Sequence, residues 1–366
     1  MMKDINITFW GRVSLTALVL LTGIYVLTGY AAGAVCSDND GRTFSFIVFG
    51  DSRGAHYGVS PILKKLIQSM TDHVEGDKPA PSFAVFLGDA AYHGGRDNLK
   101  EWEEITSALT AKIPVLFVKG NHDIYGKLNG YSYDGEFQEF QRERLDSGEI
   151  INSLCVQRPH GDAYSGFSFM WNGSLFIILD TYDMQMPNGQ RNGQRNGWIS
   201  PRQITLLNSA LDNHTMARHK FVFTHTPAFD NGIHGNITQP QYLGSWSHSF
   251  MDMWKIIDKH RVDIVFSAHN HYYARKKIDS TVAPEWKNGV LQVITGGAGA
   301  PLYDPESCVG DICFKYDTPP NIGKTYHFII VTVAANGVSY KVYDLDDKLV
   351  EEYVISTVER ERGTMR

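Results

Sequence analysis

Several short apolar segments of this sequence end in side chains that bind metal ions or transfer protons. Asp51 follows the apolar run 44–50, and Asp89 follows a similar run. Amide and imidazole side chains end further runs along the chain. The complete set is Asp51, Asp89, Asn121, His122, His225, His269 and His271. Oxygen and imidazole donors without thiolates suit Mn, Fe or Zn, and they disfavour a closed structural site built from cysteines.

The segments before these residues have the pattern of strands that are buried on both faces. Each is a continuous run of apolar, often β-branched residues, as in strands covered by helices. The runs are 44–50, 82–89, 113–123, 174–180, 219–225, 262–271 and 290–297. Helices are predicted over 60–70 and 98–109. Ligands of open α/β sheets bind beyond the carboxyl ends of the strands, so we expect the polar residues to meet there.

The spacing of these residues suits a pair of cations. A carboxylate can bridge two metal ions that lie about 3.5–4 Å apart, and Asp89 is placed to do so. His269 and His271 are two positions apart, so in an extended segment they project to the same side. Together they would supply one ligand to each ion.

The remainder of the chain supplies antiparallel strands and loops. Residues 326–355 contain apolar runs separated by the turn pairs Asn336-Gly337 and Asp346-Asp347, which predicts a meander. We therefore expect mixed sheets. We interpret the Gly- and Tyr-rich stretch 124–173 as a lid or rim, and the repeat at 188–197 as an exposed loop.

The ordered motifs "FGDSR", "GDAAYHGG", "GNHD", "THTP" and "SAHNHYY" resemble those of the calcineurin-like metallophosphoesterase family. The resemblance spans about residues 44–300 and rests on five motifs in order, each after an apolar strand. It implies an α/β fold with four layers, in which two mixed β-sheets are flanked by helices. We expect one domain over 41–357, and the charged C-terminal residues 358–366 are expected to form a flexible tail.

The resemblance also implies a ligand set for each of two metal ions, which share Asp89. The first set is Asp51, Asp89 and His271. The second set is Asp89, Asn121, His225 and His269. His122 would face the substrate and protonate the leaving group. The ions would be divalent or mixed-valence Mn, Fe or Zn, and a hydroxide bound between them would attack a phosphomonoester or phosphodiester.

Two positions depart from the family pattern near the first ion. Arg53 stands where the family usually has a histidine ligand. It would grip a phosphate oxygen with its planar guanidinium. Tyr92 matches the G-D-x-x-Y pattern of purple acid phosphatases, which makes it either a ligand or a packing residue. A non-catalytic phosphoester-binding protein with a degraded metal site is therefore the alternative function.

The first residues indicate export. Lys3 and Arg12 precede an apolar segment that ends in Ala32-Gly33-Ala34, so residues 1–34 fit a signal peptide cleaved after Ala34. An uncleaved membrane anchor over 13–35 is the other interpretation. The protein would be periplasmic or secreted, and its four cysteines fit disulfides in that setting. Cys308 and Cys313 are the expected pair, with Cys36 and Cys155 following by elimination.

Composition excludes two other classes. Hydrophobic residues make up 43% of the chain and charged residues 20%, which excludes wholesale disorder. The net charge is −6 and the basic residues are scattered, so we expect no nucleic-acid surface. The expected partner is a phosphoester substrate, with a membrane only if the N-terminal segment stays uncleaved.

Overall fold

Two six-stranded mixed sheets form the centre of the fold in a computed structural model of the protein. The structure describes residues 42–126, 133–146, 164–183, 197–231, 247–306 and 314–356. The first sheet has the order β12 (Leu349–Ser356), β11 (Gly337–Asp344), β10 (His327–Ala334), β1 (Phe44–Phe49), β2 (Pro81–Phe86) and β3 (Val115–Phe117). The second has the order β4 (Phe167–Trp171), β5 (Ser174–Ile178), β6 (Lys220–Phe223), β7 (Ile264–Ser267), β9 (Val290–Thr295) and β8 (Tyr273–Ile278).

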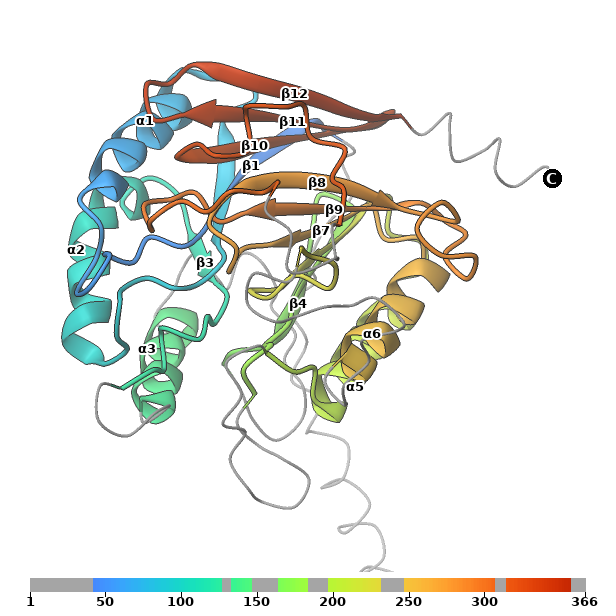
Figure 1. Ribbon diagram of the computed structural model, residues 1–366, viewed down its shortest axis with the longest axis horizontal. Helices are drawn as coiled ribbons and strands as arrows, with labels where there is room; N and C mark the ends of the chain where they lie inside the picture. Colours follow the sequence, from blue (N-terminus) through green and yellow to red (C-terminus); the bar gives the residue numbers. More distant parts are fainter. Residues whose placement is uncertain are drawn as a thin grey trace, which may run out of the picture. The chain divides into compact units, whose positions relative to one another are not determined.

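Helices cover the outer face of each sheet, which completes the four predicted layers (Figure 1). Against the first sheet lie α1 (Ile62–Gly76), α2 (Arg96–Thr110) and α3 (Asp134–Asp146). Against the second lie α5 (Pro201–Asn213) and α6 (Ser247–Lys259). None of the helices in the described part of the chain is long and apolar enough to span a bilayer.

Phenylalanines hold the two sheets together. Phe46 of β1 lies edge-on to Phe176 of β5 at 5.3 Å and to Phe221 of β6 at 5.4 Å between ring centroids. All three are fully buried, and each such side chain contributes about 1.5–3 kcal/mol of apolar burial. Because rings from both sheets interlock, this core sets how the two sheets are placed relative to one another.

Parallel pairing brings the carboxyl ends of the central strands together. In the first sheet β1, β2 and β3 are parallel, while β10, β11 and β12 add antiparallel strands. In the second sheet β5, β6, β7 and β9 are parallel, with β4 and β8 as antiparallel edges. The predicted meander is confirmed, and its turns lie at 335–336 and 345–348.

Several predicted boundaries were wrong. The run 113–123 forms strand only over Val115–Phe117, because a turn begins after it. The helix predicted over 60–70 extends to Gly76. The stretch 124–173 is more than a lid or rim, since its described part contains α3 and β4, which belong to the layers. The N-terminal segment, all four cysteines, most of the repeat and the tail lie outside the described residues.

Candidate metal centre

Three of the predicted ligands lie on turns with left-handed backbone conformation. Asp51, Asp89 and His269 have φ angles of 61°, 59° and 67°. Such a conformation costs a non-glycine residue of order 1–3 kcal/mol, and it persists where the surrounding structure holds it. The backbone at Gly88, with φ 91°, lies close to the backbone at Gly120. Only glycine fits there, because a Cβ on residue 88 would lie 2.6 Å from the backbone nitrogen of Gly120. Three of the seven non-glycine residues with positive φ in the described part of the chain are therefore candidate ligands at the strand ends.

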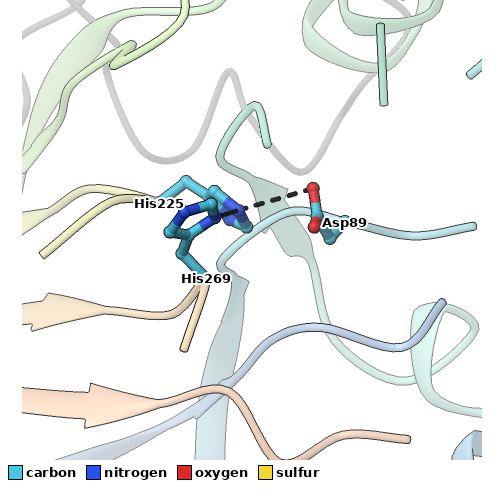
Figure 2. Close-up of side chains that lie close together, drawn as sticks. All are labelled: Asp89, His225 and His269. Carbon is cyan, nitrogen blue, oxygen red and sulfur yellow. Dashed lines mark hydrogen bonds and ion pairs between the residues drawn. The ribbon is translucent and has the colours of Figure 1, made fainter. Parts of the chain in front are cut away.

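One group of donors, which we call site 2, consists of Asp89, Asn121, His225 and His269. His225 Nε2 lies 3.4 Å from Asp89 Oδ1 and 3.2 Å from Asn121 Oδ1. His269 Nδ1 lies 3.1 Å from the same amide oxygen and 3.3 Å from His225 Nε2. Figure 2 shows the two imidazoles side by side, with Asp89 facing them from the other sheet.

A second group, which we call site 1, consists of Asp51, Asp89 and His271. Its donor atoms lie within 4.8 Å of one another, as do those of Asp89, His225 and His269 in site 2. His271 Nε2 is 3.5 Å from Asp51 Oδ1. Asp89 belongs to both groups, so the two sites adjoin at this carboxylate.

Backbone carbonyls fix the orientation of three imidazoles. His225 Nδ1 donates to Leu87 O at 2.6 Å, and His271 Nδ1 donates to Pro301 O at 2.8 Å. A hydrogen bond of this kind leaves Nε2 to carry the metal-binding lone pair, and it orients the ring. His122 Nδ1 likewise donates to Tyr92 O at 2.6 Å.

The electrostatics of the site depend on burial and on pairing. Burial disfavours the charged form of His225, but attraction to Asp89 and Asp51 raises its pKa to about 9. Burial would raise the pKa of Asp89, yet the charges of His225 and His122 hold it well below its usual value. Burial raises the pKa of Asp51 well above its usual value, although His225 opposes this. A cation would take the place of the proton on His225 and would favour both ionised carboxylates.

The donors present fit two cations. Asp51 Oδ1 is buried and accepts no hydrogen bond within the described part of the chain. Its other oxygen accepts from His269 N at 2.7 Å, so the carboxylate is held in place with one oxygen facing the cluster. Carboxylates, an amide oxygen and imidazoles are the donor set that Mn, Fe and Zn take, and all of these residues are buried except Asn121, which is half-buried.

Asp123 is a site residue that sequence reasoning missed. Its carboxylate accepts from Asp89 N at 2.9 Å, from Ala90 N at 2.8 Å and from Gly120 N at 2.7 Å. It therefore ties the turn of Asp89 to the turn that carries Asn121. Burial and the nearby charge of Asp89 raise the pKa of Asp123 to about 7. The "GNHD" motif contained the residue, but only the turn geometry shows its role.

Lys119 forms a second support for the same turn. It is 1% exposed, and its Nζ lies 2.7 Å from a carboxylate oxygen of Asp180 and 2.8 Å from one of Asp134. Asp180 follows β5 of the second sheet and also accepts from Ser165 Oγ at 2.8 Å. Lys119 thus connects both sheets and the start of α3 immediately before Gly120.

Arg53 and Tyr92 contact one another. Arg53 is 9% exposed, and its guanidinium lies 5.5 Å from the centroid of the Tyr92 ring. The Tyr92 ring also contacts those of His93 and His122. Tyr303, which the sequence analysis did not single out, stacks on His271 with ring centroids 4.2 Å apart.

Comparison with known proteins identifies the family. The calcineurin-like phosphoesterase family matches residues 44–273, and this chain belongs to that family. The match covers every candidate ligand. Solved structures with the same fold include a purple acid phosphatase, PPD1, from yellow lupin seeds (TM-score 0.60, 15% identity, 87% of this chain and 55% of that chain). GAP50, the anchor in the inner membrane complex of Plasmodium, has a TM-score of 0.57 at 13% identity and covers 88% of this chain and 94% of its own.

Among curated proteins, the chain is 26% identical over 217 residues to human serine/threonine-protein phosphatase CPPED1. It is 22% identical over 208 residues to purple acid phosphatase 23 of Arabidopsis thaliana. These alignments cover 57% and 55% of this chain. They cover 59% of CPPED1 and 38% of the Arabidopsis protein, less than two thirds of either.

Proposed function

We propose that this protein is a metal-dependent phosphoester hydrolase with a dinuclear centre at Asp89. The observation that carries the proposal is that site 1 and site 2 share this buried carboxylate at the carboxyl ends of the strands. Membership of a phosphoesterase family, with relatives named as phosphatases, supports the same reaction class. The substrate is a phosphomonoester or a phosphodiester.

The chain contributes binding, orientation and a proton. The donors of site 1 and site 2 would hold two cations, which would supply Lewis acidity and make a water molecule acidic enough to react near neutral pH. Arg53 adds a fixed positive charge for a phosphoryl oxygen, since its guanidinium donates in a planar fork. The proton for the leaving group comes from His122 Nε2, because its Nδ1 already donates to Tyr92 O. Burial lowers the pKa of His122, which makes its imidazolium a stronger acid.

The alternative is a protein that binds phosphoesters without hydrolysing them. Arg53 in the place of a ligand is the observation that favours it, since site 1 then has three protein donors. Turnover separates the two functions, so one experiment decides between them.

The test is hydrolysis of p-nitrophenyl phosphate and bis(p-nitrophenyl) phosphate by metal-stripped protein to which Mn, Fe or Zn is returned. We expect metal-restored turnover in the wild type and in the matched control Asp72→Asn, an exposed carboxylate on α1. Asp89→Asn should lose both ions and nearly all turnover. His122→Ala should keep the ions and lose mainly kcat. Folded protein that is inactive with every metal would contradict the proposal and favour the binding protein.

We also propose that the chain is exported, on the basis of residues 1–34. Sequencing the N-terminus of protein expressed in a host with a secretory pathway should find Val35. An intact N-terminus in the membrane fraction would favour the anchor instead. Peptide mapping of the unreduced protein tests the pairing of Cys308 with Cys313.

A further inference from the structure

Arg53 lies against site 1 and is held there by a neighbour. Its Nη1 donates to Gly54 O at 3.2 Å, and its Nη2 donates to the hydroxyl of Tyr303 at 3.5 Å. Tyr303 in turn stacks on His271, and its backbone nitrogen donates to His271 O at 2.9 Å. One tyrosine therefore contacts both a candidate ligand of site 1 and the guanidinium beside it.

The two sites differ in donors and in charge. Site 2 has four protein donors, and the amide oxygen of Asn121 lies between its two imidazoles. Site 1 has three, and one of them, Asp89, is shared. Arg53 is two residues from Asp51 in the chain, and its guanidinium bonds to the hydroxyl of Tyr303, whose ring stacks on His271 of site 1. A fixed cation so near a metal site repels an incoming cation, most strongly where burial reduces screening.

We propose that Arg53, positioned by Tyr303, makes site 1 the weaker of the two metal sites, so that site 2 fills first and site 1 fills together with phosphate. This inference rests on the proposed function. A phosphate that binds between the ions and Arg53 brings negative charge to the point where the guanidinium opposes a second cation. By linkage, bound phosphate then raises the affinity for the second ion by the same factor as the second ion raises the affinity for phosphate.

The test is a calorimetric titration of the metal-stripped protein with Mn²⁺ alone, with free Mn²⁺ counted by electron paramagnetic resonance. We expect one tight ion and a second ion bound at least tenfold more weakly. His225→Ala should remove the tight ion, and His271→Ala should remove the weak one. Two ions of equal affinity, or loss of the tight ion in His271→Ala, would overturn the inference.

Substitutions at Arg53 test the cause. Arg53→Met should tighten binding of the weak ion at least tenfold and change binding of the tight ion less than threefold. Arg53→Lys keeps the charge, so it should leave the ratio of the two Mn²⁺ dissociation constants near that of the wild type. Tyr303→Phe, which keeps the ring and loses the hydroxyl, should tighten the weak ion by a smaller factor. An unchanged ratio in Arg53→Met means that its charge is not the cause. An unchanged ratio in Tyr303→Phe means that the hydroxyl does not position Arg53.

Repeating the Mn²⁺ titration with inorganic phosphate tests whether phosphate strengthens binding of the second ion. With phosphate present, the second ion should bind more tightly to the wild type, and the gain should be smaller in Arg53→Met. An equal gain in both proteins would contradict the role of Arg53 in coupling phosphate to site 1. A wild-type protein that binds no Mn²⁺ would instead contradict the metal centre, and with it the proposed function. Thermal unfolding of each variant shows whether it is folded.

Discussion

Replacing Lys119 by Met should destabilise the protein and loosen the turn that carries Asn121. Lys119 and Asp180 are both buried, and Lys119 Nζ lies 2.7 Å from the Asp180 carboxylate. Removing one partner of a buried ion pair leaves the other charge uncompensated and costs about 3–5 kcal/mol. Asp180 would keep its hydrogen bonds from Ser165 Oγ and Tyr182 N, so we expect the lower part of that range.

A double-mutant cycle isolates this pair. Lys119→Met, Asp180→Asn and the double variant are unfolded in urea without metal, and the free energies of unfolding are compared. Because the double variant buries neither charge of the pair, its loss should be smaller than the sum of the single losses by at least about 2 kcal/mol. Lys255→Met, which breaks an exposed pair with Asp252, is the matched control and should change stability by less than about 1 kcal/mol. Additive losses would refute the reasoning.

Three further predictions concern single side chains. Asp123→Ala should weaken Mn²⁺ binding in equilibrium dialysis at least tenfold, because three backbone N–H groups lose their acceptor. Asp123→Asn should weaken Mn²⁺ binding by a smaller factor. Equal affinities in the wild type and both variants would contradict this prediction. Burial lowers the pKa of His327 to about 4, so its contribution to stability is present above pH 6.5 and is lost as the pH falls toward 4, about 3 kcal/mol in all. In urea unfolding His327→Gln should therefore lose less stability than the wild type between pH 7 and pH 4, and parallel losses would contradict the assignment. Ser200→Ala should cost about 1 kcal/mol of unfolding free energy, since Ser200 Oγ accepts from Gln203 N at the start of α5; no measurable change would show that the cap is dispensable.

The candidate ligands could be predicted because their signal is local. Each follows an apolar strand, and parallel strands bring their carboxyl ends to one edge. The turn pairs at 336–337 and 346–347 likewise predicted the meander of β10, β11 and β12. In both cases the local sequence is sufficient: an apolar run predicts the strand, and the polar residue or turn pair after it shows where the strand ends.

Other features depend on contacts between distant residues, which spacing does not contain. Lys119 meets Asp180 across 61 positions, and Arg53 meets Tyr303 across 250. Helix α3 and the edge strand β4 were not predicted within the stretch rich in Gly and Tyr. Short helices and strands are stabilised more by packing against other elements than by the propensities of their own residues. Phe137 and Phe140 of α3, for example, pack on Phe117 of β3.

The most direct test of the dinuclear centre is a crystal structure of the protein soaked in saturating Mn²⁺, with anomalous diffraction recorded at the manganese edge. We expect two anomalous peaks about 3.5–4 Å apart on either side of Asp89, one among the donors of site 1 and one among those of site 2. A map without a peak at Asp89, or with ions bound only elsewhere, would contradict it.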